Sequence, residues 1–150
     1  HLILPLRQQY KKVIGVHIRQ SDYKKLFENG KYYFNEQEVI KILDEYLAFT
    51  GLKNSEVIFV LCSEEKIDTD YFKGLEVIVA KGNEAEDLFS LASCDTIIGS
   101  RSTYGPWAAL YGNIPFIMFE REMDWDYYRQ KDMDRYFDNE KVGMLEPAVQ

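Results

Sequence analysis

The sequence predicts an α/β fold: a Rossmann-like, three-layer domain with a parallel sheet of about five strands. Short apolar runs alternate along the chain with stretches of helical periodicity, as in chains built from strand, helix and strand units. Each run is continuously apolar, which is typical of strands that helices cover on both faces. The length of 150 residues suits one domain, so we expect a single domain over residues 1–150.

Five runs rich in β-branched and other apolar residues are the expected strands. In chain order they are residues 13–18, 57–62, 75–80, 96–100 and 114–119. A helical pattern follows each run, and these patterns are residues 35–51, a short turn within 63–74, 83–94, 102–112 and about 126–137. The regular alternation predicts strands that run parallel, because each connection carries the chain back across the sheet.

The helix over residues 35–51 has the clearest end signals. Asn35 is a suitable N-cap, Glu38 stands three residues later as in a capping box, and Gly51 ends the pattern. In the helix over residues 102–112, we expect Trp107 and Tyr111 to pack against the rest of the domain.

Charge and composition exclude several classes of function. A net charge of −7 disfavours general nucleic-acid binding, which needs a basic surface. No apolar run approaches the roughly 18 residues of a membrane span.

Cys62 and Cys94 lie within apolar segments, so we expect reduced, structural thiols and a reducing compartment. The expected location is the cytoplasm, free or peripheral to the membrane.

Several phosphate-binding, hydrolytic and metal-binding motifs are absent from the sequence. It contains no GxGxxG, no Walker-type GxxxxGK and no GxSxG nucleophile elbow. Two cysteines and two histidines, all scattered, cannot form an ordinary zinc site. Three Asp-x-Asp triplets occur, at residues 68–70, 124–126 and 132–134, but such matches arise by chance in a chain with 25 acidic residues. We therefore expect no metal site.

Polar residues follow four of the five predicted strands, at the edge where this class of sheet binds ligands. They are His17, Arg19 and Asp22 after the first strand, Lys81, Gly82 and Asn83 after the third, Ser100, Arg101, Ser102, Thr103 and Tyr104 after the fourth, and Glu120 and Arg121 after the fifth. Ser102 and Thr103 also open a helix, whose caps they would form. The N–H groups of a helix start attract anions, so this edge predicts an anion site.

Two blocks of the sequence resemble one enzyme family. HIRQSDY (17–23) resembles the HxRRxDY motif of α1,2-fucosyltransferases and their relatives, which include α1,6- and protein O-fucosyltransferases. EAEDLFSLASCDTIIGSRSTYGPWAALYG (84–112) is similar to a second block of that superfamily, in which an acidic-Leu helix leads through a Cys-Asp strand to S-x-S-[ST]-[FY]. Both blocks occur in the family's order, and each reaches the end of a predicted strand.

The resemblance implies an inverting, metal-independent transfer of fucose from GDP-fucose to a glycan acceptor, without a cofactor. The chain would be the carboxyl-terminal, donor-binding half of a two-domain GT-B fold, with the amino-terminal acceptor domain missing. Carried over residue by residue, the substrate site would contain His17, Arg19, Asp87, Ser100, Ser102 and Thr103. Arg19, the expected catalytic residue, would grip the β-phosphate. Asp87 and His17 would lie against the guanosine, and Ser102 and Thr103 would bind the remaining phosphate oxygens.

The sequence departs from the family pattern at two places. Gln20 stands where the motif has a second arginine, and Pro106-Trp107 replaces an aromatic pair. No general base can be named, since Asp22 is better suited to fixing its loop. Two alternatives to a fucosyltransferase therefore stay open. One is a related domain that uses another sugar nucleotide, and the other is a non-catalytic interaction module in polysaccharide biosynthesis.

Overall fold

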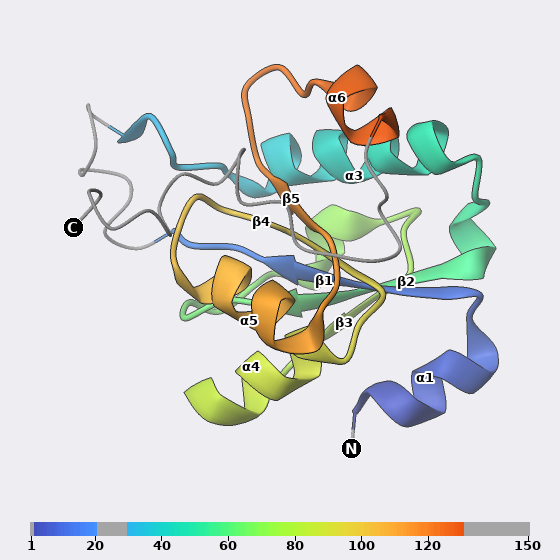
Figure 1. Ribbon diagram of the computed structural model, residues 1–150, viewed down its shortest axis with the longest axis vertical. Coiled ribbons are helices and arrows are strands. Elements are labelled where there is room, and N and C mark those ends of the chain that lie inside the picture. The colour runs from blue at the N-terminus through green and yellow to red at the C-terminus, as the bar shows by residue number, and fades with distance from the viewer. Residues whose placement is uncertain (1, 21–29, 131–150) are drawn as a thin grey trace.

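Figure 1 shows the chain as a computed structural model, which describes residues 2–20 and 30–130. Within these residues, five parallel strands form one sheet in the order β3-β2-β1-β4-β5. The strands are β1 (Lys12–His17), β2 (Val57–Cys62), β3 (Val77–Val79), β4 (Thr96–Gly99) and β5 (Phe116–Met118). The helices are α1 (Ile3–Gln9), α3 (Glu36–Thr50), α4 (Glu84–Ala92), α5 (Tyr104–Gly112) and α6 (Trp125–Arg129), with 3₁₀ turns at Asn54–Glu56 and Thr69–Phe72. The predicted Rossmann-like α/β fold is confirmed.

The sheet lies between two helical layers, α3 and α6 on one face and α1, α4 and α5 on the other (Figure 1). Successive residues of the central strand β1 point to opposite faces. Ile14 and Val16 belong to the core beneath α3, whereas Val13 belongs to the core beneath α4 and α5. All three side chains are fully buried. This double burial explains why the strand reads as one continuous apolar run.

The start of α3 has the capping box that its sequence predicts. The Asn35 side chain accepts a hydrogen bond from the Glu38 N–H at 2.9 Å, and the Glu38 carboxylate accepts one from the Asn35 N–H at 3.0 Å. Gly51 ends the helix in the left-handed conformation, with φ of 76°. A residue without a side chain adopts this conformation at little cost, so the glycine is a suitable helix end.

Element lengths differ from the prediction mainly at the sheet edges and chain ends. β2 covers the predicted residues 57–62, whereas the edge strands β3 and β5 are shorter because each pairs with a single neighbour. Helix α1 was not predicted: it buries only Ile3 and Leu6, so it shows little helical periodicity. Helix α6 covers Trp125–Arg129, the beginning of the predicted last helix, and residues 131–137 of that prediction lie outside the described residues.

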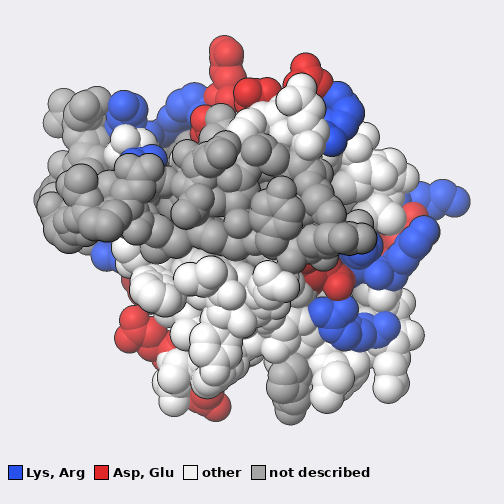
Figure 2. Space-filling model, in the orientation of Figure 1, with Lys and Arg blue, Asp and Glu red and all other residues white. Residues whose placement is uncertain are grey.

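Helix α5 packs with its small residues, so the prediction that Trp107 and Tyr111 are packing residues is wrong. Their exposed fractions are 54% and 68%. Close packing requires small side chains here, because a Cβ at Gly112 would come within 2.1 Å of the Ala92 backbone oxygen in α4. The large rings therefore lie on the outer face of α5. Figure 2 shows this face as an uncharged surface.

Both cysteines are buried free thiols, as predicted. Burial raises the pKa of Cys62 to about 12 and also raises that of Cys94, with the neighbouring Asp87 carboxylate adding to the shift at Cys62. Thiols in such apolar surroundings stay protonated and unreactive. Over residues 2–20 and 30–130, every helix is too short or too polar to cross a lipid bilayer.

Candidate functional site

A cavity of about 520 Å³ opens at the carboxyl edge of the sheet, the edge at which this fold class binds ligands. Residues from the ends of β1 and β2 and from the starts of α4 and α5 form its wall. The lining residues are His17, Arg19, Cys62, Ser63, Glu64, Gly82, Glu84, Asp87 and Tyr104. The structure thus brings three of the predicted site residues, His17, Arg19 and Asp87, into one cavity.

The central position of β1 brings His17 and Arg19 to the middle of this edge. His17 is the last residue of β1 and is paired in register with Cys62 of β2 and Gly99 of β4. Beyond the strand end, the Arg19 N–H donates a hydrogen bond to Ser100 Oγ at 2.8 Å. Neighbouring strands on both sides therefore fix the backbone from which these two side chains project.

His17 is a neutral imidazole at pH 7. Burial lowers its pKa from 6.5 to about 4; the Glu64 carboxylate opposes this shift and the Arg19 guanidinium adds to it. The side chain is only 5% exposed, and its Nδ1 has no hydrogen-bond partner among the described residues. A buried polar atom without a partner is costly, so it suits a site that a ligand completes.

Arg19 faces a carboxylate across the cavity. Its Nε lies 4.0 Å from Glu64 Oε1, and both side chains are more than a third exposed. An ion pair of this kind contributes little, about 0–1 kcal/mol, so an arriving anion can compete for the guanidinium. Among the described lining residues, Arg19 supplies the one cationic group, whereas Glu64, Glu84 and Asp87 supply three carboxylates.

Asp87 lies in the first turn of α4 and lines the same cavity as the end of β1. Its Oδ1 accepts a hydrogen bond from the Gly82 N–H at 3.1 Å, which orients the carboxylate. Partial burial raises its pKa above the usual 3.8, the Gly82 hydrogen bond opposes this shift, and Glu86 adds to it. A carboxylate held in this way accepts hydrogen bonds from a ligand's N–H or O–H groups.

The three hydroxyl residues after β4 lie in different surroundings. Ser100 is fully buried behind the cavity wall, where its Oγ accepts from the Arg19 N–H. Ser102 is also buried, and its Oγ has no hydrogen-bond partner among residues 2–20 and 30–130. Thr103 is exposed at the N-cap position of α5.

The prediction that Ser102 and Thr103 cap α5 is wrong. No side-chain hydrogen bond caps this helix among the described residues. The reason is the backbone of Thr103, whose φ of −85° and ψ of −23° are helical. A capping side chain usually reaches the helix N–H groups from an N-cap backbone that is not helical.

Apart from Cys62, which was expected as a structural thiol, three residues of the cavity wall were not among the sequence candidates. Ser63 and Glu64 follow β2, and Glu84 begins α4, where its backbone oxygen accepts a hydrogen bond from the Tyr104 hydroxyl. The strand-end rule could have found Ser63 and Glu64, because they follow an apolar run as directly as the other candidates do.

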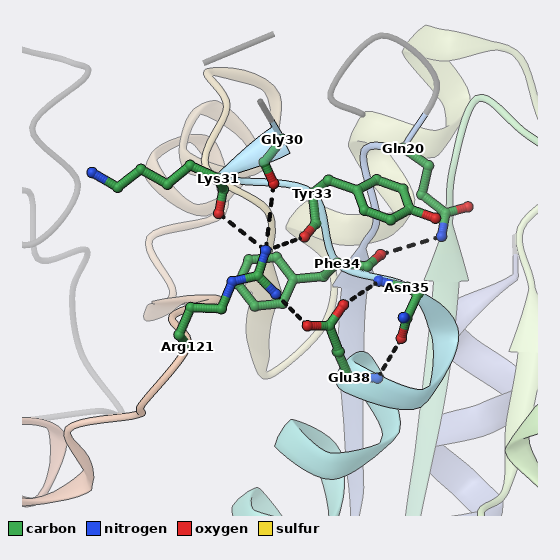
Figure 3. A network of polar contacts seen from close by, with 8 residues as sticks. All are labelled: Gln20, Gly30, Lys31, Tyr33, Phe34, Asn35, Glu38 and Arg121. Atoms are coloured by element: carbon green, nitrogen blue, oxygen red, sulfur yellow. Dashed lines mark hydrogen bonds and ion pairs between the residues drawn. The ribbon is translucent and has the colours of Figure 1, made fainter. Parts of the chain in front are cut away.

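Gln20 points away from this cavity. Its side-chain nitrogen donates to the Phe34 backbone oxygen at 3.3 Å, a contact drawn in Figure 3, and to Glu36 Oε1 at 2.9 Å. The side chain is buried between the end of β1 and the start of α3. In this structure, the position that departs from the arginine motif therefore makes contacts within the fold.

Arg121, a candidate after the fifth strand, also lies outside the cavity lining. Its guanidinium pairs with the Glu38 carboxylate and donates to the backbone oxygens of Lys31 and Tyr33 (Figure 3). It also lies over the Phe34 ring, 4.1 Å from the ring centre. These contacts anchor the segment that leads into α3. Asp22, the other charged candidate of the motif, lies outside the described residues.

The paired aspartates have structural partners where the structure describes them. Asp68 accepts from the Asp70 N–H at 3.0 Å, and Asp124 accepts from the Tyr127 N–H at 3.1 Å. The third pair, at residues 132–134, lies outside the described residues. Within the described part of the chain, no three His, Cys, Asp or Glu side chains form a group that could hold a metal ion.

A second cavity, of about 750 Å³, adjoins the first between β3 and α4. Gly82 and Asp87 line both cavities, so Asp87 stands at their common boundary. The wall of the second cavity includes the apolar side chains of Ile78, Val79 and Phe89. Together the two cavities offer a charged compartment beside a more apolar one.

Comparison with known proteins identifies similar solved structures and no family. No protein-family profile matches the sequence, and no curated protein matches it. The crystal structure of POFUT1 in complex with GDP is similar, with a TM-score of 0.53 and 11% sequence identity, over 74% of this chain and 44% of that chain. POFUT1 in complex with GDP-fucose gives a TM-score of 0.51 and 12% identity, over 74% and 42%. This chain thus spans less than half of either POFUT1 chain, and the likeness shows a shared fold.

Proposed function

We propose that this chain is the donor-binding domain of a fucosyltransferase-like glycosyltransferase, which holds GDP-fucose at the carboxyl edge of the sheet. The observation that carries the proposal is the meeting of Arg19 and Asp87 in one cavity of a fold shared with POFUT1. The two POFUT1 crystal structures are complexes with GDP and with GDP-fucose. The resemblance of residues 17–23 and of residues 84–112 to fucosyltransferase motifs supports the same ligand.

Arg19 is the proposed phosphate-binding and catalytic residue. A planar guanidinium can form two parallel, charge-assisted hydrogen bonds to the β-phosphate. Negative charge grows on the diphosphate as the bond to fucose breaks, so a fixed cation there stabilises the transition state more than the ground state. The reaction we propose is an inverting, metal-independent transfer, in which the protein's own groups neutralise the leaving diphosphate.

Asp87 and His17 are the proposed nucleoside contacts. Guanine presents neighbouring N–H groups, and the Asp87 carboxylate, already oriented by Gly82, suits them as an acceptor. The neutral His17 imidazole adds no charge next to the base, and its Nδ1 has no hydrogen-bond partner among the described residues, so a ligand group or a water can supply one. The more apolar second cavity beside Asp87 provides room for the flat base.

The start of α5 is the proposed site for the remaining phosphate oxygens. The buried Ser102 hydroxyl has no described partner, and Thr103 lies beside it at the helix N-terminus. The first N–H groups of a helix have no intrahelical partner and attract anions. Helix α5 has nine residues, so it is long enough for its N-terminus to attract an anion in this way.

The complete enzyme would have a second domain. In a GT-B arrangement this chain would be the carboxyl-terminal half, and an amino-terminal domain would hold the glycan acceptor. The proposed location is the cytoplasm, free or peripheral to the membrane. Arg19 suits an anionic group, and the three carboxylates of the cavity lining suit hydrogen-bond donors, a combination that a sugar nucleotide offers.

The alternatives are another sugar-nucleotide donor and a non-catalytic module. The uncharged Gln20 within the motif is the observation that keeps both open. Titration with GDP, GDP-fucose, UDP-glucose and ADP-glucose, followed by calorimetry and by the melting temperature, tests the proposal, since a ligand of the folded form raises its stability. Tightest binding of the guanine nucleotides supports it. Preference for another base indicates a changed donor, and binding of none of them indicates a non-catalytic module.

A further inference from the structure

Two neighbouring segments hold the backbone that carries Arg19. Directly after β1, the Arg19 N–H donates to Ser100 Oγ at 2.8 Å, and the next N–H, that of Gln20, donates to Glu64 Oε1 at 3.2 Å. Ser100 follows β4 and Glu64 follows β2, so the two contacts come from opposite sides of the central strand. Such paired contacts restrict the direction in which the Arg19 side chain leaves the backbone.

Ser100 makes two hydrogen bonds to this stretch. Its N–H donates to the His17 backbone oxygen at 2.9 Å, while its Oγ accepts from the Arg19 N–H. The close approach depends on Gly99, because a Cβ there would come within 3.0 Å of the His17 oxygen. Since Ser100 is fully buried, its hydroxyl acts on the backbone of Arg19 from behind the cavity wall.

Gln20 holds the other end of the same stretch. Its side-chain nitrogen donates to the Phe34 backbone oxygen and to Glu36 Oε1, which connects the end of β1 to the start of α3 (Figure 3). The side chain is 7% exposed and is not part of the cavity lining. An amide fits this place because it donates to a carbonyl and a carboxylate at once without burying a charge of its own.

We propose that Ser100 and Gln20 are positioning residues: they hold the Arg19 guanidinium toward the cavity and contact no ligand themselves. The inference rests on the proposed role of Arg19 as the group that binds diphosphate. It assigns Gln20, the departure from the arginine motif, to the support of Arg19. On this proposal, the site loses no phosphate contact by having Gln20 in place of the motif's second arginine.

The test is a double-mutant cycle with GDP and guanosine as ligands. Ser100→Ala and Gln20→Met each weaken GDP binding by about 5- to 20-fold, because Arg19 loses its fixed direction. In an Arg19→Ala background, either change alters GDP affinity by less than about twofold, since the positioned group is gone. Guanosine, which lacks phosphate, binds all variants with affinities within about twofold. Titration calorimetry at low ionic strength measures these weak affinities.

Matched controls and the outcomes separate positioning from other roles. Ser55→Ala and Gln37→Met make the same changes at exposed positions and should leave GDP affinity unchanged. If Ser100→Ala or Gln20→Met still weakens GDP binding by about 5- to 20-fold in the Arg19→Ala background, the inference is overturned, because the residue would then contact the ligand directly. A lower melting temperature without any change in GDP affinity would overturn it as well. Gln20→Met keeps the test decisive if Ser100→Ala does not fold. A wild-type chain that binds no GDP would instead refute the proposed function.

Discussion

The His17 and Tyr104 rings lie against each other at the carboxyl edge of the sheet, with centroids 4.9 Å apart and planes inclined by 41°. The contact joins the end of the central strand β1 to the first residue of α5. It forms one wall of the cavity that also contains Arg19 and Asp87. Tyr104 is held in turn by a hydrogen bond from its hydroxyl to the Glu84 backbone oxygen, so strand and helix ends are fixed relative to each other.

The buried His17 makes folding stability depend on pH. Its pKa is about 4 in the folded chain and about 6.5 when unfolded, so between these values the unfolded chain binds more protons. The stability from His17 is fully present above pH 6.5 and is lost as the pH falls toward 4, by about 3 kcal/mol in total. Urea unfolding at several pH values should show a smaller decrease for His17→Gln than for the wild type. Equal pH profiles for the two chains would contradict the buried neutral state.

Substitution of Ser102 should weaken GDP binding without lowering the free energy of unfolding. Its buried hydroxyl has no described partner, so Ser102→Ala removes an unsatisfied polar atom and leaves the free energy of unfolding unchanged or higher by up to about 1 kcal/mol. The same change should weaken GDP binding by about tenfold if the hydroxyl contacts a phosphate oxygen. Chemical denaturation and GDP titration measure the two effects. Ser55→Ala, at an exposed position, is the control. A large loss of stability with unchanged GDP affinity would mean that Ser102 serves the fold.

Asp87 should determine which base binds. Asp87→Asn keeps the shape of the side chain but replaces one acceptor oxygen by a donor, which opposes the N–H groups of guanine. We expect GDP to bind roughly 10- to 100-fold more weakly, with little change for UDP or ADP. The control is Asp70→Asn, at an exposed position. It is preferred to Asp95→Asn because Asp95 pairs with Arg7. Equal losses for all three nucleotides would argue against base recognition by Asp87.

The contact between α4 and α5 depends on Gly112. A Cβ there would come within 2.1 Å of the Ala92 backbone oxygen, which cannot move without shifting α4. Gly112→Ala should therefore destabilise the chain by about 1–3 kcal/mol, although alanine favours helix elsewhere. Denaturant unfolding of the two chains gives the difference. A Gly112→Ala chain that is more stable than the wild type would contradict this close contact between α4 and α5.

Sequence reasoning succeeded where local patterns decide the structure. The buried run over residues 57–62 matches β2, because a strand covered on both faces has to be apolar throughout. The capping box of Asn35 and Glu38 was predicted because both partners lie within one helical turn. Helix α1 and the exposed Trp107 were not predicted, since which face of a helix is covered depends on distant segments.

The candidate site was partly predictable for the same reason. A parallel sheet brings its strand ends together, so the sequence pattern alone indicates that His17 and Arg19 lie near the start of α4. The roles of Ser100 and Gln20 depend on contacts with distant segments, the Arg19 backbone in one case and the start of α3 in the other. No local pattern indicates such contacts. The burial of Ser102 likewise follows from packing and not from its neighbours in sequence.

The affinity of the Arg19→Ala chain for GDP, compared with its affinity for guanosine, tests the central claim most directly. If Arg19 holds the diphosphate, the change weakens GDP binding by about 2–4 kcal/mol and leaves guanosine binding unchanged. Arg129→Ala, which removes an exposed arginine outside the cavity, should leave both affinities unchanged. A GDP affinity that is the same in the wild-type and Arg19→Ala chains would contradict the account.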